Sequence, residues 1–80
     1  MKTIYVFLAD GFEEIEALTP IDVLRRAGLH VVTISVMNDQ MVNGAHGVPV
    51  MADCMFDEID THAADMLLLP GGMPGAENLD

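Results

Sequence analysis

Two uninterrupted apolar segments constrain the fold of this chain more than any other feature. Residues 3–9 read TIYVFLA and residues 30–36 read HVVTISV. Strands without apolar/polar alternation are buried on both faces, which is typical of parallel sheets. The segment between them carries apolar side chains at every third position, at Phe12, Ile15, Leu18, Ile21 and Leu24. This pattern predicts a helix, and strand, helix and strand at this spacing predict a right-handed βαβ unit.

The predicted helix contains a proline. Pro20 is expected to kink it or to split it into two pieces, with Thr19 capping the second piece. Gly28 follows Arg25 and Arg26. Cations suit a helix C-terminus and glycine suits the residue after it, so we expect the helix to end there.

The rest of the chain predicts smaller elements. Asn43-Gly44 lies between short apolar pieces and indicates an antiparallel hairpin within residues 41–51. Residues 55–64 predict a short helix or turn, and residues 65–69 a third buried strand. Eighty residues make at most one small domain. The predicted strands and helix make the fold class α/β, with a parallel sheet. Three strands do not complete such a sheet, so residues 1–80 are expected to be the first half of one domain.

Charge and cysteine content exclude several functions. The net charge is −10, from 13 acidic and 3 basic residues, which disfavours binding to nucleic acid or to anionic membranes. The apolar runs are too short to span a bilayer. A single cysteine cannot form an intrachain disulfide, and acidic residues follow the first apolar run where a secretory signal would have a cleavage site. We therefore expect a soluble, cytoplasmic protein.

Two loops should meet at the carboxyl edge of the sheet, where parallel sheets bind their ligands. One is residues 10–16, after the first strand, and the other is residues 70–75, after the third. Gly71 and Gly72 permit close approach of the backbone to a ligand, and their N–H groups could form an oxyanion hole. A plain glycine-rich turn is the alternative. The second loop matches neither a Walker A nor a GxGxxG motif, so no nucleotide cofactor is expected.

The glutamates of the first loop differ in position. Glu13 and Glu14 lie in the first helical turn, where the helix dipole favours carboxylates, and the simplest interpretation is solvated charge. Glu16 lies at the flank of the apolar stripe and could reach the crevice. Spacing alone still favours a solvated Glu16.

The remaining reactive residue types predict little chemistry. Cys54 lies outside both loops and has no Lys or Arg beside it in sequence, so we interpret it as a structural thiol. The three histidines, His30, His46 and His62, share no metal-ligand spacing. We therefore predict no metal site.

Two motifs in order resemble the DJ-1/PfpI superfamily, closest to its DJ-1/YajL/ThiJ-like branch. Residues 10–28, DGFEEIEALTPIDVLRRAG, are similar to the family's G-x-E-E-x-E … P-x-D-V-x-R-R-A-G signature. Residues 65–79, DMLLLPGGMPGAENL, are similar to its D-x-x-x-L-P-G-G-x-x-G-A-x-N-L signature. The resemblance covers essentially the whole chain. It implies a flavodoxin-like parallel-sheet sandwich, a homodimer and no cofactor.

The resemblance also implies roles for individual residues. Glu16 matches the acid that hydrogen-bonds the nucleophilic cysteine, as a protonated carboxyl donating to the thiolate. Gly71 and Gly72 match the glycines whose N–H groups line the anion pocket. The resemblance therefore reverses the preference from spacing and makes Glu16 the candidate catalytic residue.

The family's nucleophile lies downstream of the PGG motif, on an A-x-C-x-G elbow that residues 1–80 do not contain. Cys54 lies upstream and does not match it. The partner expected for this chain is therefore a C-terminal half carrying the nucleophilic cysteine and the histidine that often accompanies it. Residues 1–80 by themselves, whether a truncated product, a designed fragment or part of a nicked chain, are expected to be inactive.

Three functions follow for the complete protein. The first is a cofactor-independent glyoxalase- or deglycase-like enzyme acting on small α-oxoaldehydes or their adducts in the stress response. The second is an amidase- or peptidase-like hydrolase using the same thiolate. The third is a non-enzymatic redox sensor or chaperone, in which Glu16 favours oxidation of the cysteine to the sulfinate.

Overall fold

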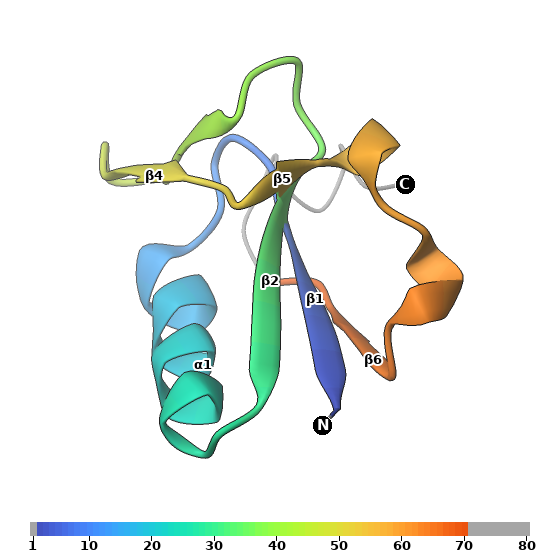
Figure 1. Ribbon diagram of the computed structural model, residues 1–80. Helices are drawn as coiled ribbons and strands as arrows, with labels where there is room; N and C mark the ends of the chain where they lie inside the picture. Colours follow the sequence, from blue (N-terminus) through green and yellow to red (C-terminus); the bar gives the residue numbers. More distant parts are fainter. Residues whose placement is uncertain (1, 71–80) are drawn as a thin grey trace.

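A four-stranded parallel sheet forms the centre of the molecule in the computed structural model, which describes residues 2–70 (Figure 1). The strand order is β5-β2-β1-β6, and β3 and β4 form a separate antiparallel pair. In chain order the helices and strands are β1 (Thr3–Leu8), α1 (Glu14–Arg26), β2 (His30–Ser35), β3 (Met41–Asn43), β4 (Pro49–Met51), β5 (Cys54–Met55) and β6 (Met66–Leu68). The sheet confirms the expected α/β class with parallel strands.

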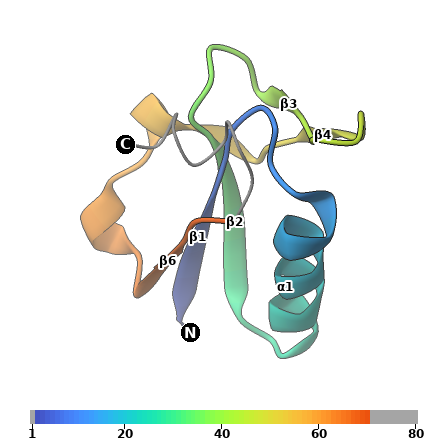
Figure 2. The same ribbon diagram turned by 180° about the vertical axis from the view of Figure 1, so that it is seen from behind.

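The central strand β1 separates two apolar clusters. Ile4, Val6 and Leu8 pack on the side of α1, with Ala17 and Ile21 of the helix. Tyr5 and Phe7 pack on the other side, with Ile34 and the partly buried Ile59 and Ala64. Two single-turn 3₁₀ helices, Phe56–Glu58 and Thr61–Ala63, lie on that second side, away from α1 (Figures 1 and 2). Burial on both faces is the reason why β1 carries an unbroken apolar run.

Helix α1 is one continuous helix, so the expectation that Pro20 splits it is wrong. Thr19 lies inside the helix, and Glu13 precedes its first residue. Ala17 and Ile21, on either side of Pro20, are both buried against the sheet. This packing outweighs the hydrogen bond that proline cannot donate, a cost of about 3 kcal/mol in an isolated helix.

The end of α1 lies where the sequence predicts it. The N–H of Gly28 donates to the carbonyl of Arg25, and the N–H of Leu29 to that of Leu24, at 3.0 and 3.2 Å. Gly28 has a φ of +85°, which glycine adopts without strain. These two bonds form a Schellman motif, which closes the helix and turns the chain into β2.

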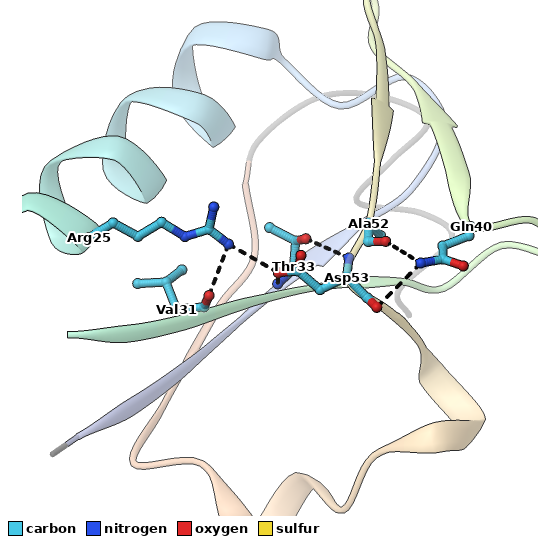
Figure 3. Close-up of polar contacts among 6 residues, drawn as sticks. All are labelled: Arg25, Val31, Thr33, Gln40, Ala52 and Asp53. Carbon is cyan, nitrogen blue, oxygen red and sulfur yellow. Dashed lines mark hydrogen bonds and ion pairs between the residues drawn. The ribbon is translucent and has the colours of Figure 1, made fainter. Parts of the chain in front are cut away.

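Asp53 joins the C-terminal part of α1 to β2 and to the start of β5 (Figure 3). Its Oδ2 accepts hydrogen bonds from the backbone N–H of Thr33 at 2.9 Å and from Arg25 at 3.0 Å. Its own N–H donates to the carbonyl of Thr33, also at 2.9 Å. The side chain of Gln40 donates to the carbonyls of Ala52 and Asp53. These bonds bring a two-residue strand, too short for any sequence pattern to predict, into the sheet.

Strand β6 lies at an edge and is less buried than predicted. Met66 and Leu67 are about half exposed, at 51% and 48%, and Leu68 is the residue of this strand that packs against the core. The hairpin predicted within residues 41–51 is confirmed as β3 and β4. Within residues 2–70, no helix combines the length and apolarity that crossing a membrane requires.

Candidate functional site

The connection between β1 and α1 is held in place by the β3–β4 hairpin. The N–H of Gly11 donates to the carbonyl of Asn43, and the N–H of Ala45 to that of Phe12, both at 2.8 Å. The N–H of Asn43 donates to the carboxylate of Asp10 at 3.0 Å. Phe12 is buried, at 1% exposed. The hairpin therefore fixes the path of the loop after β1 and the position at which α1 begins.

Glu16 lines a hollow at the carboxyl edge of the sheet. The hollow has a volume of about 270 Å³, and its lining includes Val6 of β1, Glu16 and Pro20 of α1, and Leu69 and Pro70 after β6. Glu16 is exposed as well, which agrees with the preference from spacing alone. Glu16 and Pro70, which come from the two segments expected to face each other, both line this hollow. Gly71 and Gly72 lie outside the described residues, and the catalytic role of Glu16 stays a prediction.

Glu14 is buried, so its interpretation as solvated charge is wrong. The residue is 8% exposed. Its Oε2 accepts hydrogen bonds from the backbone N–H of His46 at 2.7 Å and of Val48 at 3.4 Å, and its Oε1 lies 2.9 Å from Nδ1 of His46. Because the side-chain bond to His46 and the backbone donors favour the ionised form, the pKa of Glu14 is lowered to about 2.

Glu13 and His46 complete this cluster. The Oε1 of Glu13 lies 3.6 Å from the Nδ1 of His46. The pKa of His46 is raised, first by its hydrogen bond to Glu14 and then by the charge of Glu13. Sequence reasoning missed this cluster because His46 lies 32 residues beyond Glu14, on a hairpin loop whose path spacing does not reveal.

Ligand-capable atoms of Glu13, Glu14 and His46 lie within 4.8 Å of one another, which is close enough for a shared metal ion. Both oxygens of Glu14 already accept hydrogen bonds from the hairpin loop. The arrangement is therefore accounted for by hydrogen bonds alone, and the expectation that the protein binds no metal stays a prediction.

Cys54 lies in β5, at the sheet edge opposite β6. Burial raises the pKa of its thiol, and the carboxylates of Glu58 and Asp53 raise it further. A raised pKa reduces the thiolate fraction, and the thiolate is the nucleophilic form. This environment agrees with the interpretation of Cys54 as a structural thiol.

Comparison with known proteins gives consistent matches along the chain. A sequence model of the DJ-1/PfpI family matches residues 2–80. Protein DJ-1 homolog B of Arabidopsis thaliana is 41% identical over 78 residues, which are 98% of this chain and 18% of that protein. Deglycase TK1284 of Thermococcus kodakarensis is 36% identical over 69 residues, 86% of this chain and 41% of that protein.

The fold has close counterparts among solved structures. The structure of oxidized Toxoplasma gondii DJ-1 has a TM-score of 0.94 and 42% sequence identity, covering 98% of this chain and 42% of that one. Residues 1–80 therefore span less than half the length of each of these relatives. The likeness also confirms the flavodoxin-like architecture expected from the sequence.

Proposed function

Because this chain belongs to the DJ-1/PfpI family, we propose that the complete protein is a cysteine-dependent enzyme acting on small α-oxoaldehydes or their adducts. In this proposal a C-terminal part carries the nucleophilic cysteine and completes the domain. The relative named as a deglycase, 36% identical to this chain, supports the choice of substrate class.

The position of Glu16 is the observation that carries this proposal. It lines the hollow beside Pro70, the residue that precedes Gly71 and Gly72 in the chain. A thiolate in this hollow would attack the aldehyde carbon, and the carbonyl oxygen would become an oxyanion. The N–H groups of Gly71 and Gly72 would stabilise that oxyanion, while Glu16 would hydrogen-bond the thiolate before attack.

The surroundings of the site support further parts of the proposal. Leu67 and Leu69, at 48% and 62% exposed, leave the β6 edge for the C-terminal part to cover. We also propose that the complete protein is a cytoplasmic homodimer. Exposed apolar side chains on α1 and the hairpin, among them Ile15, Val23 and Met51, support the dimer.

Substitution of Glu16 in the complete protein tests the proposal. Glu16→Leu removes the hydrogen bond and should lower the alkylation rate of the nucleophilic cysteine at pH 6 by about tenfold. Glu16→Gln keeps a donor, so its rate should stay close to wild type. Consumption of methylglyoxal should fall in parallel with the alkylation rate.

Equal alkylation rates for wild type and Glu16→Leu would contradict the role of Glu16. A reactive cysteine without turnover of any α-oxoaldehyde would instead favour the redox-sensor alternative. The hydrolase alternative would be favoured by turnover of amide or peptide substrates.

A further inference from the structure

The carboxylate of Glu14 fastens the hairpin loop, residues 44–48, to the first turn of α1. Oε2 accepts from the backbone N–H of His46 and more weakly from that of Val48, while Oε1 contacts the His46 ring. Two of these donors belong to the backbone, so they hold the path of the loop and not only one side chain. A buried carboxylate with several donors is a strong and directional link.

The loop is shaped to receive this carboxylate. A Cβ on Gly44 would overlap the Glu14 side chain, reaching 2.5 Å from Cδ and 2.7 Å from Cγ. Gly44 does not have a positive φ, so backbone conformation does not require glycine here. Gly47 differs, because its φ is +82° and a Cβ there would meet nothing within 4 Å. The glycine at position 44 is therefore explained by the space that Glu14 occupies.

Glu14 and Glu16 lie in the same helical turn and point in nearly opposite directions. Residues two apart differ by about 200° around a helix. Glu14 faces the hairpin loop, and Glu16 faces the hollow beside Pro70. The bonds from Glu14 to the hairpin loop prevent the first turn of α1 from rotating. They therefore also set the direction in which the Glu16 side chain points.

We propose that Glu14 is a positioning residue, whose carboxylate holds residues 44–48 against α1 and thereby orients Glu16 toward the nucleophile. This inference rests on the proposed function, because it presumes that Glu16 acts on the cysteine. It assigns Glu14 no contact with substrate. It also explains why a carboxylate lies buried where solvated charge is expected.

The test measures cysteine alkylation against pH in the complete protein, for Glu14→Ala, Glu16→Leu and the double variant. Misplacement of a reacting group by about 1 Å can cost about 100-fold in rate, so a partial loss of orientation in Glu14→Ala should lower the rate at pH 6 by roughly tenfold. In the Glu16→Leu background the same substitution should change the rate by less than about twofold, because nothing remains to be oriented. Glu14→Gln keeps an acceptor for the backbone N–H groups and should restore most of the rate.

Glu13→Ala is the matched control, because Glu13 accepts none of the described backbone bonds from residues 44–48, and its rate should equal wild type. Gly44→Ala crowds the carboxylate without removing it and serves as a second variant if Glu14→Ala does not fold. Gly44→Ala should likewise lower the alkylation rate in the wild-type background and have little effect in the Glu16→Leu background.

The outcomes separate this inference from the proposed function. If Glu16→Leu lowers the rate and neither Glu14→Ala nor Gly44→Ala does, the positioning role is overturned and the proposed function stands. Equal losses from Glu14→Ala in both backgrounds, as general destabilisation would produce, also overturn it. If Glu16→Leu itself has no effect on the rate, the role of Glu16 fails and the positioning role of Glu14 fails with it, while turnover of methylglyoxal still tests the proposed enzymatic activity.

Discussion

At the scale of single residues, Glu14 and Glu16 show how one helical turn can give two carboxylates different environments. Both lie near the helix N-terminus, where the dipole favours negative charge. Glu14 is buried among donors of the hairpin loop, and Glu16 is exposed beside the hollow. The sequence could place both on the helix. It also set Glu16 apart by its position on the helix, but it could not predict the burial of Glu14, because the His46 that bonds to Glu14 comes from a distant loop.

The pair of Glu14 and His46 should make stability depend on pH. Glu14 has a lowered pKa, so its contribution is present above the ordinary value of 4.5 and lost as pH falls toward about 2. His46 has a raised pKa, so its contribution is present below the ordinary value of 6.5 and lost as pH rises through the raised value. The contribution of the pair is therefore greatest between those two ordinary values.

Urea unfolding of the complete protein checks this expectation with His46→Gln. The midpoint of wild type should exceed that of His46→Gln most clearly near pH 5.5, and less at pH 3 and at pH 9. His62→Gln is a suitable control, because the described bond of His62 is donated by its backbone N–H. A difference between wild type and His46→Gln that stays constant with pH would refute the charge pairing.

At the scale of elements, Asp53 links a helix and two strands through backbone and side-chain bonds. Thr33, whose N–H it accepts, is 5% exposed. Arg25 and Asp53 are about half exposed, at 48% and 47%, so their ion pair contributes little by itself. The hydrogen bond from the buried N–H of Thr33 to the Asp53 carboxylate therefore contributes more to holding β5 beside β2 than the ion pair does.

Asp53→Ala should therefore destabilise the complete protein by about 2 kcal/mol, since it leaves a buried donor without its acceptor. Asp22→Ala is the matched control. Asp22 pairs with Arg26 on the exposed face of α1, so its loss should cost less than about 0.5 kcal/mol. Thermal or urea unfolding measures both values, and similar costs for the two variants would contradict the bridging role of Asp53.

Elements with a long periodic pattern were predictable from sequence, and those created by tertiary contacts were not. The apolar runs of β1 and β2 and the repeat of α1 identify the βαβ unit, and Gly28 marks the helix end. The continuity of α1 through Pro20 depends on packing against the sheet. The two residues of β5 depend on hydrogen bonds from Asp53. At the site, the meeting of Glu16 with Pro70 follows from parallel topology, whereas the burial of Glu14 depends on how the hairpin folds back.

At the scale of the whole molecule, the parallel sheet presents an apolar edge at β6. Met66, Leu67 and Leu69 are between 48% and 62% exposed. An edge strand with exposed apolar side chains and unpaired backbone groups favours association with another chain. Residues 1–80 are therefore expected to need the C-terminal part of the domain for stability.

Residues 1–80 produced alone should unfold gradually with heat or urea, without a sharp transition, and should associate as their concentration rises. Circular dichroism and sedimentation would measure these two properties. The complete protein, measured in parallel, should unfold in one cooperative step. A sharp, concentration-independent transition of residues 1–80 would refute this expectation.

The parallel arrangement of β1 also has a consequence for synthesis on the ribosome. Among the strands within residues 2–70, β1 is synthesised first, and of its two neighbours β2 follows soon while β6 follows much later in the chain. Thr3, at the start of β1, bonds to Asp65, which lies 62 residues further on. At about 5–20 residues synthesised per second, the edge of β1 that pairs with β6 stays unpaired for roughly 3–12 s. During that interval one edge of this apolar strand is available to chaperones and to neighbouring nascent chains.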